Sequence, residues 1–355
     1  MATRAVITGW GTYIPKNEIK NEHFSNHEFY DLEGNPLHYD NEVIISKFHA
    51  ITGIQARRYA DDDAINSDLA VVAAQRAIEH AGIDPETLDY IIFAHNFGDV
   101  STGSTQGDML PSLGSKVKHA LKIANPNCVA YDILFGCPGW IEGVIQANLF
   151  IKAGDAKKCL VIGGETLSRV VDPHDRDSMI YADGAGACVV EAKEDAESGI
   201  LAYASQTFTL DEAYYLFYGT TNKKGGEDNT KYIKMYGRKI YEFAITNVPK
   251  ALQLVLEKSG LSIDDVKKVF IHQANEKMDE AIVKRFYRLY KKPMPEGVMP
   301  MTIQKLGNSS VATIPTLICS VLTGQVEGQE IKPGDIAIFA SVGAGMNVNA
   351  IVYRF

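Results

Sequence analysis

Cys137 is the residue in this sequence that is best placed to act as a nucleophile. An apolar segment, residues 129–135, runs into the turn Gly136-Cys137-Pro138-Gly139, and an almost wholly apolar helix is predicted to follow. Pro138 suits the first turn of that helix, where its missing N–H costs nothing. Cys137 would therefore stand at a buried helix N-terminus, whose dipole and free N–H groups stabilise the thiolate that covalent acyl transfer requires. A buried cysteine that only caps a turn is the alternative interpretation.

Two polar residues in the second half of the chain could assist such a nucleophile. His272 ends a short apolar segment, and the carboxyl ends of strands are where sites form in α/β sheets. Asn308 lies in Gly307-Asn308-Ser309 ahead of an apolar helix, and its amide N–H could donate to developing negative charge. Each has a structural alternative, since His272 could be a satisfied core histidine and Asn308 a helix N-cap.

The chain repeats itself at an offset of about half its length. Residues 82–94 (GIDPETLDYIIFA) and 260–272 (GLSIDDVKKVFIH) both follow a predicted helix and pass through an acidic turn into an apolar strand. Residues 151–165 and 331–345 form a second pair at nearly the same offset. Helices alternate with apolar strands in each half, which indicates mostly parallel sheets with helices on both faces. Two such halves would stack as a layered α/β/α/β/α body.

We divide the chain into residues 1–195, which carry Cys137, and residues 196–355, which carry His272 and Asn308. The division falls in the segment KEDAESG, where charge and glycine interrupt the apolar pattern. His272 stands where the first half has Ala94, so the repeat predicts a site in one half only. Residues 20–47 and 205–238 have no counterpart in the other half, and long insertions of this kind are often substrate lids or interface pieces.

Composition and charge disfavour several classes of function. A chain of 355 residues with 46% hydrophobic and 22% charged residues is typical of a globular protein. The net charge of −9 argues against a broad nucleic-acid-binding face. We expect no membrane span and no secretory signal, because no apolar run is long enough and the first residues lack an apolar core. Five cysteines without a CxxC spacing indicate reduced thiols and a cytoplasmic location.

The remaining motifs are weak. No GK[ST] follows a glycine cluster and no GxSxG occurs, so neither a phosphate-binding loop nor a serine nucleophile elbow is predicted. His23 and His27 are four residues apart but lack a third ligand at metal-binding spacing, so no metal site is predicted. Three cations, Lys277, Lys284 and Arg285, follow His272 on a predicted amphipathic helix. They could dock an anionic partner or simply form a solvated helix face.

Five segments together resemble the β-ketoacyl-acyl-carrier-protein synthase III family of the thiolase superfamily. In the family's order they are FGCPGW around Cys137, DGAGA (183–187), IHQAN (271–275), GNSSVATIP (307–315) and VGAGMNVNAIVYRF (342–355). The resemblance covers essentially the whole chain. It implies the duplicated five-layer thiolase fold with two similar halves, usually as a homodimer.

The resemblance also implies a reaction. Cys137 would accept an acyl group from a thioester primer, and a malonyl thioester, normally on acyl carrier protein, would then enter. His272 and Asn308 would stabilise the enolate that forms as carbon dioxide leaves, and this carbanion would attack the acyl group on the cysteine. The backbone N–H groups of Cys137 and Ala344 would hold the oxyanion. Such a decarboxylative Claisen condensation serves fatty acid or related secondary-metabolite biosynthesis and needs no metal or redox cofactor beyond the coenzyme A or phosphopantetheine of its substrates.

The implied binding residues are a docking helix and one arginine. The family's carrier-protein docking helix matches Gln273, Lys277, Lys284 and Arg285. The cations among them would suit an acidic carrier protein. Arg176 matches the arginine on one face of the adenine of coenzyme A. The tryptophan and arginine expected ahead of Thr52-Gly53-Ile54 are replaced by Lys47 and Ile51, so an acyl-carrier donor becomes plausible beside acyl-coenzyme A.

Three other functions stay open on the same residues. A same-fold acyltransferase would pass the acyl group from Cys137 to an oxygen or nitrogen acceptor. A non-decarboxylating, hydroxymethylglutaryl-type condensing enzyme would need a glutamate base near the cysteine, and Glu79 is a candidate by rough position. A catalytically silent subunit would have lost the nucleophile. Asn308 favours decarboxylative condensation, because decarboxylation needs a second donor beside His272.

Overall fold

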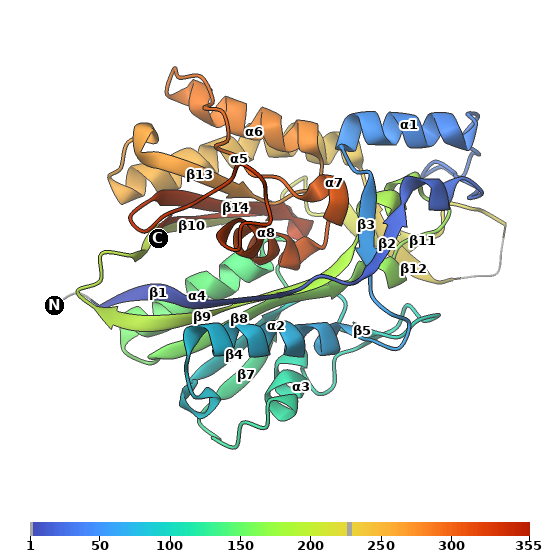
Figure 1. Ribbon diagram of the computed structural model, residues 1–355. Helices are drawn as coiled ribbons and strands as arrows, with labels where there is room; N and C mark the ends of the chain where they lie inside the picture. The colour runs from blue at the N-terminus through green and yellow to red at the C-terminus, as the bar shows by residue number, and fades with distance from the viewer. Residues whose placement is uncertain (1–2, 226–228) are drawn as a thin grey trace.

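Two sheets form the frame of the protein, and helices cover both faces of each (Figure 1). The computed structural model describes residues 3–225 and 229–355. The first sheet contains, in order across it, β1 (Thr3–Tyr13), β9 (Asp183–Glu194), β8 (Lys158–Thr166), β4 (Tyr90–Ala94) and β7 (Val129–Ile133). The second contains β10 (Gly199–Thr207), β15 (Asn347–Arg354), β14 (Ile336–Gly343) and β13 (Val266–Ile271).

Three layers of helices enclose these sheets. The outer layers are α2 (Asn66–Ala81) and α3 (Leu113–Ala120) on the first sheet, and α5 (Gly237–Ser259) and α6 (Glu276–Leu289) on the second. Between the sheets lie α4 (Gly139–Ala153) and α8 (Thr313–Leu322), whose apolar side chains share one core with strands of both sheets. The predicted five-layer thiolase-like fold is therefore confirmed. Among the described residues, no helix combines the length and the apolar character needed to cross a membrane.

The two halves repeat one another in three dimensions. Strands β1, β9, β8 and β4 correspond in order and direction to β10, β15, β14 and β13. The preceding helices also end alike, since Gly82 after α2 and Gly260 after α5 both adopt the left-handed conformation, with φ of 64° and 72°. This conformation costs glycine least, which explains the shared residue. Our division of the chain falls in the turn between β9 and β10.

The expectation of mostly parallel sheets holds for strand direction in all but one strand of each sheet, β9 and β15. β4 runs parallel to β7 and β8, and β13 runs parallel to β14, but β9 and β15 are antiparallel to both of their neighbours. The apolar runs in β9 and β15 reflect burial on both faces, which does not depend on strand direction. The connection from β14 to β15 is the short turn η7 (Ala344–Met346), which suits an antiparallel pair and is too short for a parallel crossover.

The two unmatched insertions lie beside each other (Figure 1). The first, residues 20–47, runs from the end of β2 (Asn17–Lys20) through the short helix η1 (Asn21–Phe24) into α1 (Asn41–Thr52), and β2 pairs with β3 (Ala56–Tyr59). The second supplies β11 (Leu216–Thr220) and β12 (Lys231–Met235). Phe24 and Phe29 of the first and Ile233 of the second share a hydrophobic cluster. The remaining strands and α-helix are β5 (Asp99–Val100), β6 (Gly107–Asp108) and α7 (Ile303–Leu306).

Candidate active site

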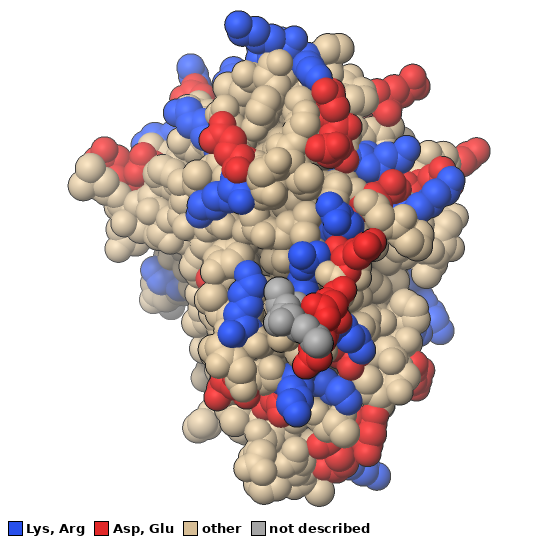
Figure 2. Space-filling model, turned by 90° about the vertical axis from the view of Figure 1, so that its left-hand side faces the viewer, with Lys and Arg blue, Asp and Glu red and all other residues tan. Residues whose placement is uncertain are grey.

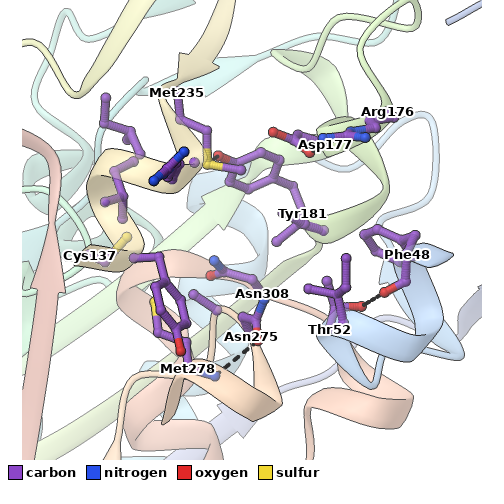
Figure 3. Close-up of a pocket in the computed structure, with 18 of the residues that line it drawn as sticks. Phe48, Thr52, Cys137, Arg176, Asp177, Tyr181, Met235, Asn275, Met278 and Asn308 are labelled. Carbon is purple, nitrogen blue, oxygen red and sulfur yellow. Dashed lines mark hydrogen bonds and ion pairs between the residues drawn. The ribbon is translucent and has the colours of Figure 1, made fainter. Parts of the chain in front are cut away.

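Cys137, His272 and Asn308 line one cavity of about 440 Å³. The cavity walls are mainly apolar and include residues of both insertions, among them Leu37 and Leu216. Cys137 lies at one end of it and Arg176 at the other, with Asn308 between them (Figure 3). The fold thus brings together the three residues that the sequence separates by up to half the chain, and it places the two insertions around them.

The turn that carries Cys137 joins β7 to α4. Gly136 has a φ of 66°, in the region that favours glycine, and Pro138 forms the N-cap of α4, one position earlier than predicted. Cys137 thus precedes a helix that is buried along most of its length, with Trp140, Ile141 and Val144 all at most 1% exposed. The predicted position of the cysteine, at a buried helix N-terminus, is what the structure shows.

The turn after β14 packs directly on the cysteine. A Cβ atom at Gly136 would lie 2.6 Å from the backbone nitrogen of Ala344, so only a glycine allows this approach. The Asn347 side chain holds the two turns together, because its Nδ2 donates to the carbonyl oxygens of Ala344 (2.9 Å) and Phe135 (3.3 Å). The two predicted oxyanion donors, the N–H groups of Cys137 and Ala344, therefore belong to touching turns.

The amide group of Asn308 is held in one orientation. Its Oδ1 accepts the backbone N–H of Ser310 at 2.8 Å, which leaves Nδ2 as the group that can donate into the cavity. The backbone of Asn308 is fixed as well, since its N–H donates to Ile180 and its carbonyl oxygen accepts from Ala182. Asn308 is not a helix N-cap, because η6 (Ser310–Ala312) intervenes before α8 and has Ser309 at its N-cap.

His272 is a buried, neutral imidazole. It follows β13, and its backbone N–H donates to Ala340 on the adjacent strand at 2.8 Å. Burial lowers the pKa of its side chain to about 4, so the ring is uncharged near neutral pH. Within the described part of the chain its Nδ1 has no hydrogen-bonding partner, so Nε2 is the nitrogen left for a substrate. A neutral ring with a free N–H is a donor to a developing oxyanion.

The resting nucleophile is a thiol rather than the thiolate that we expected. Burial raises the pKa of Cys137 to about 11. A hydrogen bond from the side chain of Ser310 lowers this pKa, whereas the nearby charge of Glu165 raises it. Dehydration of the thiolate thus outweighs the favourable helix N-terminus in the empty site. The pKa must fall when substrate binds or as the reaction proceeds.

The far end of the cavity is cationic. Lys47, Arg176 and Arg238 all line it, and the side chains of Arg176 and Arg238 are 60% and 92% exposed. Lys47 lies over the ring of Tyr39, with 3.7 Å from Nζ to the ring centroid. On the side of the protein that carries both chain ends, basic and acidic side chains are instead interspersed (Figure 2). The cluster of cations at the cavity is therefore a local feature of an acidic protein.

Of the four residues predicted to dock a carrier protein, one is buried and three are exposed. Gln273 is fully buried: its Nε2 donates to Pro300 at 2.9 Å, and its Oε1 accepts the N–H of Thr302 at 2.8 Å. It supports the strand end and cannot contact a partner, which corrects the prediction. The other three, Lys277, Lys284 and Arg285, are exposed cations of α6. Of these, Lys277 lies closest to the cavity, in a shallow groove that shares Ile51 with the cavity wall.

Sequence reasoning also missed a carboxylate behind the cysteine. Glu79, the candidate base, is exposed on α2, on the face of the first sheet away from α4. The glutamate that acts electrostatically on Cys137 is Glu165 of β8, and it is only 1% exposed. The sequence could have indicated its position, because Glu165 comes at the end of the apolar segment CLVIGGE, just as His272 follows the apolar segment VFI.

Known proteins resemble this chain over its whole length. A family model described as 3-oxoacyl-[acyl-carrier-protein (ACP)] synthase III matches residues 131–208, and one for the C-terminal part of that family matches residues 256–355. The beta-ketoacyl-[acyl-carrier-protein] synthase III of Erythrobacter litoralis is 32% identical over 358 residues, covering 99% of each chain. The one of Aquifex aeolicus is 34% identical over 353 residues, covering 98% of this chain and 99% of that protein.

The fold agrees with these matches. The crystal structure of 3-oxoacyl-[acyl-carrier-protein] synthase III from Aquifex aeolicus superimposes with a TM-score of 0.81 at 31% identity, covering 99% of this chain and 100% of the other. Sequence and fold thus agree from one end of the chain to the other, and the chain belongs to the 3-oxoacyl-[acyl-carrier-protein] synthase III family.

Proposed function

We propose that this protein is a condensing enzyme that loads an acyl group onto Cys137 and joins it to a malonyl thioester, in fatty acid or related secondary-metabolite biosynthesis. The observation that carries the proposal is the meeting of Cys137 with His272 and Asn308 in one cavity. The two relatives described above are named beta-ketoacyl-[acyl-carrier-protein] synthase III, which supports the same reaction class.

The first step is transfer of the acyl group. A bond forms between Sγ of Cys137 and the acyl carbon, the bond from that carbon to the donor's sulfur breaks, and the cysteine's proton leaves with the donor thiol. The tetrahedral intermediate carries an oxyanion, which the backbone N–H groups of Cys137 and Ala344 would stabilise from two touching turns. Donors that are fixed before the reaction stabilise such charge without reorganisation.

The second step is decarboxylation and carbon–carbon bond formation. Nε2 of neutral His272 and Nδ2 of Asn308 donate to the carbonyl oxygen of the malonyl thioester. Carbon dioxide leaves, and the electron pair of the broken bond becomes an enolate that attacks the acyl carbon on Cys137. The cysteine sulfur then departs and takes up a proton. The electrons for the new bond come from the broken carbon–carbon bond, so we propose that the reaction uses no metal and no redox cofactor.

The position of Glu165 argues against the non-decarboxylating alternative. Such an enzyme needs a base that reaches the incoming acyl group, whereas the cavity wall of the described residues includes neither Glu165 nor Glu79. An acyltransferase would share the first step, so the acceptor used by the loaded enzyme has to separate it from a condensing enzyme.

We propose acyl carrier protein, acyl-coenzyme A or both as partners. A phosphopantetheine arm ends in a phosphate, and Lys47, Arg176 and Arg238 are placed around the cavity to receive it. Lys277, with Lys284 and Arg285 further along α6, would face the acidic surface of a carrier protein. We expect the reaction to take place in the cytoplasm, where the protein's cysteines would stay reduced.

We also propose that the protein is a homodimer formed through β7. This strand is the edge of the first sheet, and its neighbourhood exposes apolar side chains: Val129, Leu134 and Leu110 are 47%, 63% and 89% exposed. An exposed apolar edge strand favours pairing with another strand. Light scattering should give the dimer mass for the wild type and a smaller mass for Leu134→Asp. Leu289→Asp, on α6, is the matched control, and a monomeric wild type would refute the dimer.

The function is tested by intact-protein mass spectrometry. We would incubate the protein with acyl-coenzyme A and acyl-carrier thioesters of several chain lengths and then add malonyl-carrier protein. An adduct that is absent from Cys137→Ala but retained by Cys128→Ala, and that disappears with release of carbon dioxide, is expected. An adduct that persists with malonyl-carrier protein but clears with an alcohol or amine would indicate an acyltransferase instead. No adduct from any donor would refute the proposal.

A further inference from the structure

Ser310 has an uncommon backbone conformation beside the proposed nucleophile. Its φ is 52°, in the left-handed region that side chains other than glycine rarely adopt. The conformation is held by the hydrogen bond from its N–H to Oδ1 of Asn308, and the residue is only 3% exposed. Backbone strain of this kind persists where the surroundings over-determine it, often at functional sites.

A close approach of two backbones places Ser310 behind the cysteine. η6, which begins at Ser310, packs on β8 at Gly163, where a Cβ atom would lie 2.5 Å from the carbonyl oxygen of Val311. Two residues further along β8 comes Glu165. The hydroxyl of Ser310 therefore lies near the end of β8, close enough to Cys137 to lower the pKa of its thiol.

The direction of the hydrogen bond between Ser310 and Cys137 follows from its neighbours. Nδ2 of Asn96 lies 2.5 Å from Oε1 of Glu165 and 3.1 Å from Oγ of Ser310. An amide nitrogen carries two hydrogens, so it donates to both oxygens. Because Oγ of Ser310 accepts from Asn96, its own hydrogen is free to point at the sulfur of Cys137. A donor aimed at sulfur stabilises the thiolate more than the thiol.

Glu165, which accepts a hydrogen bond from Asn96, can orient that side chain while it is itself uncharged. Burial raises the pKa of Glu165 to about 8, and hydrogen bonds from the side chain and the backbone N–H of Asn96 oppose that rise. A neutral carboxylic acid still accepts the Asn96 hydrogen bond through its carbonyl oxygen. Below about pH 8 it therefore orients Asn96 while placing little negative charge near the sulfur.

We propose that Ser310 is a further catalytic residue, whose hydroxyl donates to Sγ of Cys137 and stabilises the thiolate during acyl transfer, with Asn96 and Glu165 as positioning residues. The role rests on the proposed function of Cys137 as the nucleophile. Ser310 keeps its own proton throughout, while the proton of Cys137 leaves with the donor thiol. The described wall of the substrate cavity does not include Ser310, so the contact reaches the sulfur from the protein side.

The test is the pH dependence of Cys137 alkylation by iodoacetamide, read by mass spectrometry with Cys137→Ala as the blank. We expect Ser310→Ala and Ser310→Gly to slow alkylation about tenfold at neutral pH and to shift its midpoint to higher pH, because a hydrogen bond to a charged group is lost. Ser309→Ala is the matched control and should behave as the wild type. Wild-type alkylation in both Ser310 variants would overturn the proposal.

Two further variants separate chemistry from structure. Glycine relieves the backbone strain at position 310, so Ser310→Gly should melt no lower than Ser310→Ala and yet react as slowly. Glu165→Gln keeps an acceptor for Asn96 and removes a charge that raises the pKa of Cys137, so its alkylation midpoint should not move to higher pH, whereas that of Glu165→Leu should move up as in Ser310→Ala. Equal loss in both Glu165 variants would refute the positioning role. Alkylation needs no acyl donor, so these results stand apart from a failure of the proposed function.

Discussion

Gly343 lies against the nucleophile so closely that it has no room for a side chain. A Cβ atom there would come within 2.5 Å of the backbone nitrogen of Cys137 and 3.0 Å of its Cβ. The φ of Gly343 is −166°, an extended value open to any residue, so space alone requires the glycine. The second half of the chain thus sets the position of the nucleophile carried by the first.

Gly343→Ala should therefore reduce acyl loading of Cys137 about 100-fold or more, because it pushes apart the two turns that carry the oxyanion donors. Loading is measured by mass spectrometry. Gly260→Ala is the control: its left-handed φ makes alanine cost about 1 kcal/mol of stability, yet a Cβ there meets nothing within 4 Å. Loading that falls equally in both variants would show that lost stability, rather than the displaced turn, is responsible.

Asn308→Asp should separate loading from condensation. The aspartate can still accept the N–H of Ser310 through one oxygen, but its other oxygen cannot donate to an enolate. We expect carbon dioxide release to fall about 10²- to 10³-fold, while the acyl adduct on Cys137 forms within tenfold of the wild-type rate. Asn247→Asp, on α5, provides the control. An unchanged rate of decarboxylation would exclude Asn308 from that step.

His272 should stay neutral far below the ordinary range of histidine. Burial lowers the pKa of its side chain to about 4, so protonation, and with it loss of the neutral donor, should occur only below about pH 5. Nuclear magnetic resonance of protein with labelled imidazoles should show one ring, absent from His272→Asn, that does not titrate between pH 5.5 and 8. A midpoint near 6.5 for His272 would contradict the burial argument.

Glu165 should make the protein less stable as the pH rises. Burial raises its pKa from 4.5 to about 8, so between those values the folded protein holds a proton that the unfolded chain has released. Stability conferred by this proton is therefore present below about pH 4.5 and is lost as the pH rises towards 8. Between pH 5 and pH 8 the free energy of unfolding of Glu165→Gln should rise relative to that of the wild type, by on the order of 2 kcal/mol. Glu296→Gln, at an exposed site, is the control, and a constant difference would contradict the prediction.

Lys277 should matter only for substrates that are attached to a carrier protein. Lys277→Glu reverses a charge in the groove next to the cavity, so we expect the KM for malonyl-carrier protein to rise about threefold to tenfold. The KM for a small malonyl-pantetheine thioester should not change. Lys332→Glu, a reversal at another exposed lysine, is the control. Equal effects on both substrates would place Lys277 in the cavity's own chemistry rather than in docking.

Much of the fold could be predicted because the two halves of the sequence repeat one another. The paired segments 82–94 and 260–272 predicted two similar halves, and the glycines that end α2 and α5 explain why the echo survives. The reversed direction of β9 and β15 could not be predicted, since a strand buried on both faces is apolar whichever way it runs. β15 shows this, as it is apolar and yet antiparallel to both neighbours.

The sequence predicted the position of a site residue correctly where the residue's neighbours along the chain determine that position. Cys137 was located by the strand and helix around it. Gln273 was misplaced, because its burial depends on Pro300 and Thr302, which come from another segment. The role proposed for Ser310 could not be predicted for the same reason, since it depends on Asn96 and Cys137 from the other half of the chain. A residue's surroundings, unlike its helix or strand, are set by tertiary contacts.

The size of the cavity fixes an order of events in time. At about 440 Å³ it lies towards the lower end of the range for pockets that hold one small molecule, and the nucleophile is at its inner end. Two thioester arms cannot occupy it together, so the first must discharge and depart before the second enters. Initial velocities should follow a double-displacement rate law, and each thioester in excess should slow the reaction by occupying the form of the enzyme that awaits the other.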